Sequence, residues 1–213
     1  MATEVRGAFC VSRPFPALVD GHIPSQPFLT ACDGIVEFVS LLGTVFGPVR
    51  SDIAGNVAKL RKRIATHPPS QPTLDALVEE EQAEVVRSGS KQRMGFATEG
   101  LLWLKRGLEY LLTLLELLLA DSAEGRRTEN IAPFLKTAYE KTLKPHHNWA
   151  VSNLFRMIAH AAPYRSDLLS RLEDGERLKT EADVLAALQT YIINYSAIVA
   201  RLRSIFDHHK LPN

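Results

Sequence analysis

The sequence predicts an all-α protein, and three observations support this fold class. Residues 98–120 form a leucine-rich stretch with the periodicity of one long helix. The other apolar residues recur at helical spacing between joints that contain Pro and Gly. No stretch shows the alternation of apolar and polar residues that marks a half-buried strand. We therefore expect about eight helices packed into a single domain.

The stretch 98–120 predicts the central helix of this domain. Its leucines and aromatic residues cover most of the helix circumference, and polar residues such as Lys105 and Glu109 are confined to a narrow stripe. Such a helix must be covered on two sides, so it belongs to an inner layer. Near mid-bilayer each of its charged residues would cost about 2.5 to 3.5 kcal/mol, which favours a soluble helix over a transmembrane one.

The remaining elements follow from local signals in chain order. Four prolines in residues 1–27 prevent a continuous helix there and indicate a partly extended arm. We place the domain at 28–208 and a short tail at 209–213. Thr180 and Asp183 have the spacing of a capping box at the start of the final helix. The predicted helices, besides the central one, span residues 28–46, 49–66, 73–87, 131–143, 146–162, 164–172 and 180–208.

Composition and motifs exclude several classes of function. Lys and Arg total 25 against 24 Asp and Glu, so the chain lacks the basic surplus of a nucleic-acid binder. Cys10 and Cys32 are too few for a disulfide framework or a metal site, and we expect no metal and no cofactor. The first 24 residues lack the apolar core of a signal peptide, so we expect a cytoplasmic protein. We also expect a monomer.

One polar row on the second predicted helix is the first candidate for a binding site. Asp52, Asn56 and Lys59 stand at i, i+4 and i+7, which places them on one helix face. They offer a carboxylate acceptor, a carboxamide and an ammonium donor, a set that suits the hydroxyl groups of a neutral sugar. Periodicity alone favours the alternative that the row is an ordinary solvated helix face.

Four segments change this balance because together they resemble the signature stretches of the glycolipid transfer protein family. They occur in the family's order and cover about residues 28–203. The family implies an all-α, two-layer helical sandwich and a soluble carrier that moves a glycosphingolipid between membranes without covalent chemistry. The four segments are Ser51–Lys59 (SDIAGNVAK), Ala97–Leu108 (ATEGLLWLKRGL), Leu143–Trp149 (LKPHHNW) and Ala161–Tyr164 (AAPY).

The resemblance also assigns roles to head-group residues. It implies that Trp103 stacks against the first sugar, while Asp52, Asn56 and Lys59 bond to sugar hydroxyls. Asp52 would in addition accept a hydrogen bond from the ceramide amide, and His147 would donate one to its carbonyl oxygen. This division is physically coherent because an amide has one donor and one acceptor. Taken alone, His147 is better explained as a capping or core histidine.

The resemblance further implies a membrane contact and a hydrocarbon pocket. Trp149 matches the family tryptophan that meets the bilayer, and it selects His147 over His146 because the family histidine lies two residues earlier. Burial of Trp149 between helices is the alternative. Four apolar residues are candidate walls of a chamber for the lipid chains, although ordinary core packing explains each equally well: Phe46, Leu108, Phe155 and Ile158.

Three other functions stay open at this point. Lys59, Lys105 and Arg106 could bind the anionic head group of ceramide-1-phosphate or of a sulfated sphingolipid. In the branch that carries ceramide-1-phosphate, the family pattern has a basic residue and an arginine where this chain has Asn56 and Trp103, so sugar is favoured. A lipid sensor or scaffold that does not transfer is another alternative.

An enzyme is the third alternative, with Asp52 and His147 as an acid and base pair. The sequence has no G-x-S-x-G elbow, no H-E-x-x-H zinc motif and no phosphate-binding glycine loop, so we do not expect an enzyme.

Overall fold

The computed structural model describes residues 9–89 and 91–213, apart from the side chain of Leu41. Within these residues the secondary structure is helical, with two isolated β-bridges and no strand. This confirms the predicted all-α class. The helices are α1 (Phe9–Ser12), α2 (Ser25–Leu41), η1 (Thr44–Phe46), α3 (Gly47–Thr66), α4 (Leu74–Arg87), α5 (Phe96–Ala123), α6 (Ala132–Lys141), η2 (Lys144–His146), α7 (Trp149–His160), α8 (Arg165–Ser170) and α9 (Glu181–His208).

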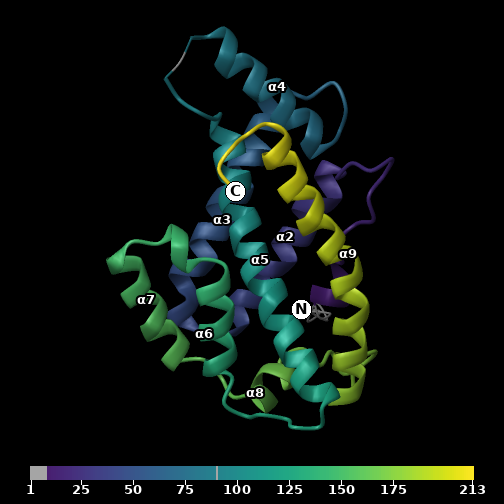
Figure 1. Ribbon diagram of the computed structural model, residues 1–213. Helices are drawn as coiled ribbons and strands as arrows, with labels where there is room; N and C mark the ends of the chain where they lie inside the picture. Colours follow the sequence, from purple (N-terminus) through teal and green to yellow (C-terminus); the bar gives the residue numbers. More distant parts are fainter. Residues whose placement is uncertain (1–8, 90) are drawn as a thin grey trace, which may run out of the picture.

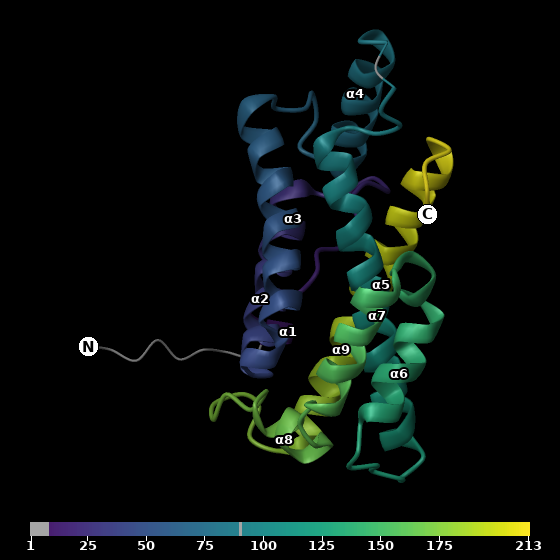
Figure 2. The same cartoon turned by 90° about the vertical axis from the view of Figure 1, so that its left-hand side faces the viewer.

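The helices form the two layers that the family resemblance implies. Figure 2 shows α1, α2 and α3 on one side and α5, α6, α7 and α9 on the other. The most extensive contact joins the layers between α3 and α5, and α5 also packs against α4, α6 and α9. In Figure 1, α4 projects from one end of the sandwich and α8 closes the other. Helix α5 therefore occupies the inner position that its leucine-rich sequence predicts.

Helix α5 carries buried charges as well as leucines. Lys105 is only 2% exposed, and its ammonium group lies 3.2 Å from the Glu109 carboxylate one turn later. Arg203 of α9 donates a 2.6 Å hydrogen bond to the same carboxylate. Pairing of this kind allows charged groups to lie inside a soluble helix layer.

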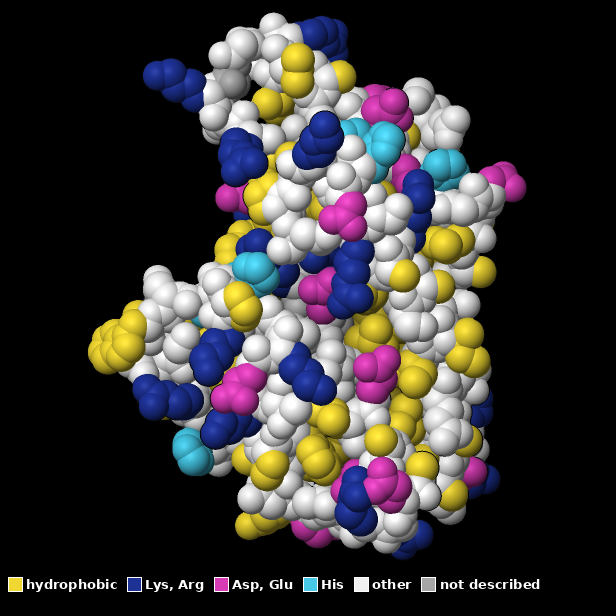
Figure 3. Space-filling view, in the orientation of Figure 1, with side chains coloured by type: hydrophobic (Ala, Val, Ile, Leu, Met, Phe, Trp, Pro, Cys, Tyr) yellow, Lys and Arg dark blue, Asp and Glu magenta, His cyan; other side chains and the backbone are white. Residues whose placement is uncertain are grey.

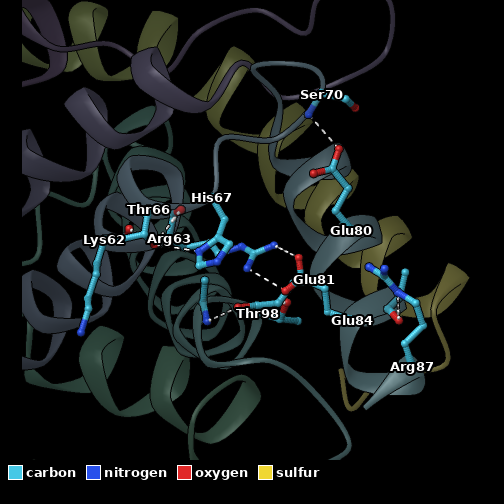
Figure 4. Close-up of polar contacts among 12 residues, drawn as sticks. Lys62, Arg63, Thr66, His67, Ser70, Glu80, Glu81, Glu84, Arg87 and Thr98 are labelled. Carbon is cyan, nitrogen blue, oxygen red and sulfur yellow. Dashed lines mark hydrogen bonds and ion pairs between the residues drawn. The ribbon is translucent and has the colours of Figure 1, made fainter. Parts of the chain in front are cut away.

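The N-terminus of α5 is held by the neighbouring helix α4. The Glu81 carboxylate accepts hydrogen bonds from the backbone N–H of Ala97 (3.1 Å), the backbone N–H of Thr98 (2.7 Å) and the Thr98 hydroxyl (2.6 Å), as Figure 4 shows in part. A Cβ on Gly95 would lie 2.2 Å from the Glu81 side chain, so only glycine fits there. A carboxylate at this position satisfies free N–H groups and complements the helix dipole.

The remaining helices agree with the sequence in most places and differ in four. The helix predicted at 28–46 ends at Leu41, and the separate turn η1 follows Gly43, whose φ of 112° breaks the helix. Helix α2 begins at Ser25, three residues before the predicted start, because Pro27 is accepted in a first turn. Helix α7 begins at Trp149, since the Asn148 side chain caps it by accepting a hydrogen bond from Val151. The predicted arm includes the helical turn α1. Phe9, also in the arm, packs into the same core as the rest of the chain. The domain boundary at residue 28 stays a prediction.

Helix α9 packs against α5 and also contacts α1. Its capping box between Thr180 and Asp183 is present, as the sequence predicts. By length and composition alone it is the one described helix that could cross a membrane. Its buried residues recur every three or four positions and face the protein, where Tyr195 donates a hydrogen bond of 2.8 Å to the Leu108 carbonyl of α5.

Candidate functional site

The predicted polar row lies on α3 where this helix meets α5. Asp52 is exposed, Lys59 is half-buried, and Asn56 is only 4% exposed. The two helices approach closely at Gly100 of α5, where an added Cβ would lie 3.1 Å from Lys59 Cδ and 3.3 Å from the Asn56 carbonyl oxygen. The row is therefore part of a helix contact and not a fully solvated face.

Trp103 lies three residues after Gly100 on α5, which brings its indole ring to this contact. The ring is half-buried. The Arg106 guanidinium lies 4.9 Å from its centroid, and the His147 ring lies 6.2 Å away at an interplanar angle of 25°. The structure thus brings His147, from the segment before α7, to Trp103 on α5.

His147 is held by two residues that the sequence did not single out. Its Nδ1 atom lies 3.2 Å from the Tyr139 hydroxyl oxygen, which lies 2.9 Å from the Ser152 hydroxyl oxygen. Tyr139 is on α6 and Ser152 is on α7, so the histidine is fastened between the two helices. No motif or periodicity marks these contacts, because they depend on how α6 and α7 pack.

The pKa values of Asp52 and His147 both shift in the direction that favours the neutral form of each group. Burial raises the pKa of Asp52, and the shift is opposed by the nearby charges of Lys59 and His147 and by the hydrogen bond from Asn56. Asp52 is open to solvent on one side, but neighbouring protein atoms displace water from the other. Burial also lowers the pKa of His147, with Asp52 opposing the shift and the charge of Arg106 adding to it. A neutral imidazole carries a single N–H, so it can donate from one ring nitrogen only.

The predicted wall residues lie in the hydrophobic core. Phe46, Leu108 and Ile158 are buried, and Phe155 is half-buried against the core. The Phe155 ring stacks on Tyr139 at 3.7 Å between centroids, so one wall residue directly adjoins the group that holds His147. Cavities of about 350 Å³ and 250 Å³ lie elsewhere, between α1 and α9 and beside His22, and neither is lined by these four residues.

The alternative that Trp149 is buried between helices is wrong. It is 79% exposed at the start of α7, and three more apolar side chains on the same helix are exposed: Val151, Leu154 and Met157. In Figure 3, hydrophobic side chains project at the left edge of the molecule, where α7 lies. We call these four residues the α7 patch. Patches of this kind on a soluble protein mark interaction surfaces.

The described residues also bear on metal binding. Among them, no group of three or more His, Cys, Asp or Glu side chains is placed to hold a metal ion. The chemistry that the site does offer is hydrogen bonding and stacking: a carboxylate, a carboxamide, an ammonium, an imidazole and an indole around one helix contact.

Comparison with known proteins gives consistent matches over most of the chain. A family model described as glycolipid transfer protein matches residues 23–174. Glycolipid transfer protein of Danio rerio is 35% identical over 186 residues, which cover 87% of this chain and 86% of that protein. Pleckstrin homology domain-containing family A member 8 of Rattus norvegicus is 34% identical over 202 residues, and this chain spans only 37% of its length.

Solved structures share the fold. The crystal structure of HET-C2, a fungal glycolipid transfer protein, matches with a TM-score of 0.76 and 30% identity, covering 95% of this chain and 94% of that one. Human ceramide-1-phosphate transfer protein in complex with ceramide-1-phosphate matches with a TM-score of 0.80 at 17% identity, covering 98% and 96%. At that identity the second match shows the fold alone, so backbone similarity does not distinguish a sugar from a phosphate head group.

Proposed function

This chain belongs to the glycolipid transfer protein family, and from that premise we propose that it extracts a glycosphingolipid from one membrane and delivers it to another. The family consists of lipid transfer proteins and not of enzymes, so no bond of the lipid changes. The observation that carries the proposal is the convergence of three parts at the α3–α5 contact: the polar row on α3, the Trp103 indole on α5 and the His147 imidazole before α7.

The sugar is bound by a combination of stacking and hydrogen bonds. A pyranose ring presents apolar C–H groups on its faces and hydroxyl groups around its edge, which suits an indole plate with polar groups beside it. Trp103 provides the plate, and Asp52, Asn56 and Lys59 provide acceptors and donors. Because Asn56 is buried where α3 meets α5, its side chain has little freedom before the sugar arrives, and less side-chain entropy is lost on binding.

The ceramide amide lies between Asp52 and His147. Asp52 accepts a hydrogen bond from the amide N–H, and His147 donates one to the amide carbonyl oxygen. An amide buried without such partners would cost about 1 to 3 kcal/mol for each unsatisfied group, so the pair also selects the amide linkage.

The hydrocarbon chains occupy the core between the layers. Exposing a 16-carbon chain to water costs on the order of 12 kcal/mol at about 0.8 kcal/mol per CH₂, so a soluble carrier must enclose it. The wall residues Phe46, Leu108 and Ile158 belong to the hydrophobic core, and Phe155 packs against it. These side chains must therefore separate to admit the lipid chains. The free energy of burying the chains offsets the cost of separating these side chains.

The membrane is met by the α7 patch. Trp149 suits the interface because its ring is largely apolar while its N–H remains hydrated. The patch adjoins His147, so the residues that contact the bilayer lie next to those that bind the amide. We further propose that the protein acts in the cytoplasm as a monomer and binds membranes only transiently.

A ceramide-1-phosphate or sulfated sphingolipid carrier is the second candidate. The observation in its favour is Arg106, which is buried beside Trp103 and has no hydrogen-bond partner at Nε. Lys105, however, has its charge paired with Glu109 and is not free to bind an anion. A phosphate prefers several charge-assisted donors, and the neutral Asn56 does not supply one, so a sugar is favoured.

The proposal is tested with donor and acceptor vesicles. Purified protein should move fluorescent monohexosylceramide between vesicles with many turnovers per protein molecule. Absence of transfer by intact, helical protein would refute the carrier role, and stoichiometric retention without transfer would identify a sensor or scaffold. Unlabelled ceramide-1-phosphate should compete with the fluorescent lipid less well than unlabelled monohexosylceramide does. A preference for the phosphate would reverse the head-group assignment. Mass analysis of the recovered lipid checks that it is chemically unchanged.

A further inference from the structure

Tyr139 links His147 to Ser152 in an unbroken chain of hydrogen bonds. The Tyr139 oxygen lies 3.2 Å from His147 Nδ1 and 2.9 Å from Ser152 Oγ. Tyr139 is only 5% exposed, and its ring is stacked on Phe155 at an interplanar angle of 10°. Packing therefore fixes the position of the Tyr139 hydroxyl group. This hydroxyl group can in turn hold the more exposed His147 ring in one orientation.

Counting hydrogens leaves two arrangements for this chain. Burial lowers the pKa of His147, so at neutral pH its ring is neutral and has one N–H. In the first arrangement, Nδ1–H donates to Tyr139 and Tyr139 donates to Ser152, which leaves Nε2 bare. In the second, Ser152 donates to Tyr139, Tyr139 donates to Nδ1, and the ring hydrogen is on Nε2.

Donor and acceptor strengths favour the second arrangement. A phenol, with an ordinary pKa of about 10, is a better donor than an alkyl hydroxyl, and an unprotonated imidazole nitrogen is a better acceptor than a hydroxyl oxygen. The second arrangement gives the best donor, Tyr139, to the best acceptor, His147 Nδ1. The first gives the phenol hydrogen to the weaker acceptor, Ser152.

We propose that Tyr139 and Ser152 are positioning residues that hold His147 with its hydrogen on Nε2, aimed at the lipid amide carbonyl. The role at the amide rests on the proposed function, whereas the tautomer is a property of the lipid-free protein. With the hydrogen on Nδ1, the bare Nε2 atom and the carbonyl oxygen would both be acceptors, and they would repel each other. The hydrogen-bond chain of Ser152, Tyr139 and His147, which we call the relay, thus determines whether the His147 ring attracts or repels the amide carbonyl.

The tautomer is measured directly by long-range ¹H–¹⁵N correlation spectra of lipid-free protein labelled at histidine. His147→Gln assigns the His147 signals among the seven histidines. In the wild type we expect Nε2 at the shift of a protonated ring nitrogen and Nδ1 at the shift of a bare, hydrogen-bonded one. Tyr139→Phe keeps the stacked ring and removes the hydroxyl, so both shifts should move toward the averages of a tautomer mixture. Transfer of monohexosylceramide should fall about 3- to 10-fold, the range for one lost hydrogen bond.

Two further variants make the test selective. Tyr110→Phe removes a hydroxyl from another tyrosine that contacts Phe155, edge-on at 5.8 Å, and it should leave the His147 shifts and transfer unchanged. Ser152→Ala breaks the far end of the chain and should shift the His147 signals in the same direction as Tyr139→Phe, by less. It also serves if Tyr139→Phe fails to fold.

The outcomes separate the two proposals. A wild-type spectrum with the hydrogen on Nδ1, or shifts that neither Tyr139→Phe nor Ser152→Ala alters, would overturn the positioning role while active transfer still supports the carrier. A wild-type protein that shows the expected tautomer but transfers no lipid would overturn the proposed function, and the spectra would still establish the relay.

Discussion

Replacing Trp149 with alanine separates membrane contact from folding, because the structure leaves this side chain 79% exposed. A fully enclosed tryptophan buries about 150–250 Å², so the remaining fifth corresponds to about 30–50 Å² and, at 25 cal/mol per Å², to about 1 kcal/mol. In a domain of this size a loss of 1 kcal/mol lowers the melting temperature by about 2–4 °C. We expect Trp149→Ala to lose most of its vesicle association and transfer activity while its melting temperature falls by no more than this small amount.

Ile158→Ala provides the matched control on the same helix. Ile158 is 4% exposed, and truncation of a buried isoleucine to alanine costs about 2–5 kcal/mol. Melting followed by circular dichroism, vesicle sedimentation and the transfer assay are run on both variants. Wild-type vesicle association by Trp149→Ala, or a fall in its melting temperature as large as that of Ile158→Ala, would show that the α7 patch is not the membrane contact.

Three further predictions address the site and the mobility of the fold. Asp52→Asn, which keeps the shape of the side chain, and Trp103→Ala should each abolish or nearly abolish transfer while the protein stays helical by circular dichroism; wild-type transfer by both would eliminate the site. Burial lowers the pKa of His147 from 6.5, so the unfolded chain binds more protons than the folded protein near and below that pH, and the free energy of unfolding should be full above about pH 6.5 and decrease toward acid. Urea unfolding at pH 7.5 and 5.5 should show a smaller decrease in this free energy for His147→Gln than for the wild type. An equal decrease in the two proteins would assign the effect to other groups. Amide hydrogen exchange should be faster in α7 than in α5 and should slow in α7 when lipid is bound; equal rates in the two helices would contradict this.

Features that depend on neighbouring residues in the chain could be predicted from the sequence. The capping box at Thr180 and Asp183 needs only four consecutive residues, and both hydrogen bonds are present. The shared face of Asp52 and Lys59 follows from helix geometry in the same way. The central helix was also predictable because leucines on most of its circumference leave no face for solvent.

Features that depend on how helices pack could not be predicted in this way. Glu81 caps α5 from another helix, and Arg203 reaches Glu109 across 94 positions of sequence. The residues Tyr139 and Ser152 were missed for the same reason, since nothing near either one in the sequence refers to His147. Even within the α3 row, the burial of Asn56 beside an exposed Asp52 is set by the line along which α5 crosses α3.

Helix α7 follows His147 and carries Trp149 and Phe155, and it is the least buried of the longer helices. Of its twelve residues only Ile158 is buried, whereas most of α5 is enclosed. Separating α7 from the core therefore exposes little apolar surface, so this helix can move at a cost that the burial of a lipid chain exceeds. The same helix begins with the exposed Trp149, directly follows His147 and its N-cap Asn148, and places Phe155 against the core. In the proposed mechanism, contact with a bilayer that displaces α7 therefore acts at once on His147 and on Phe155, and this couples lipid uptake to the membrane surface.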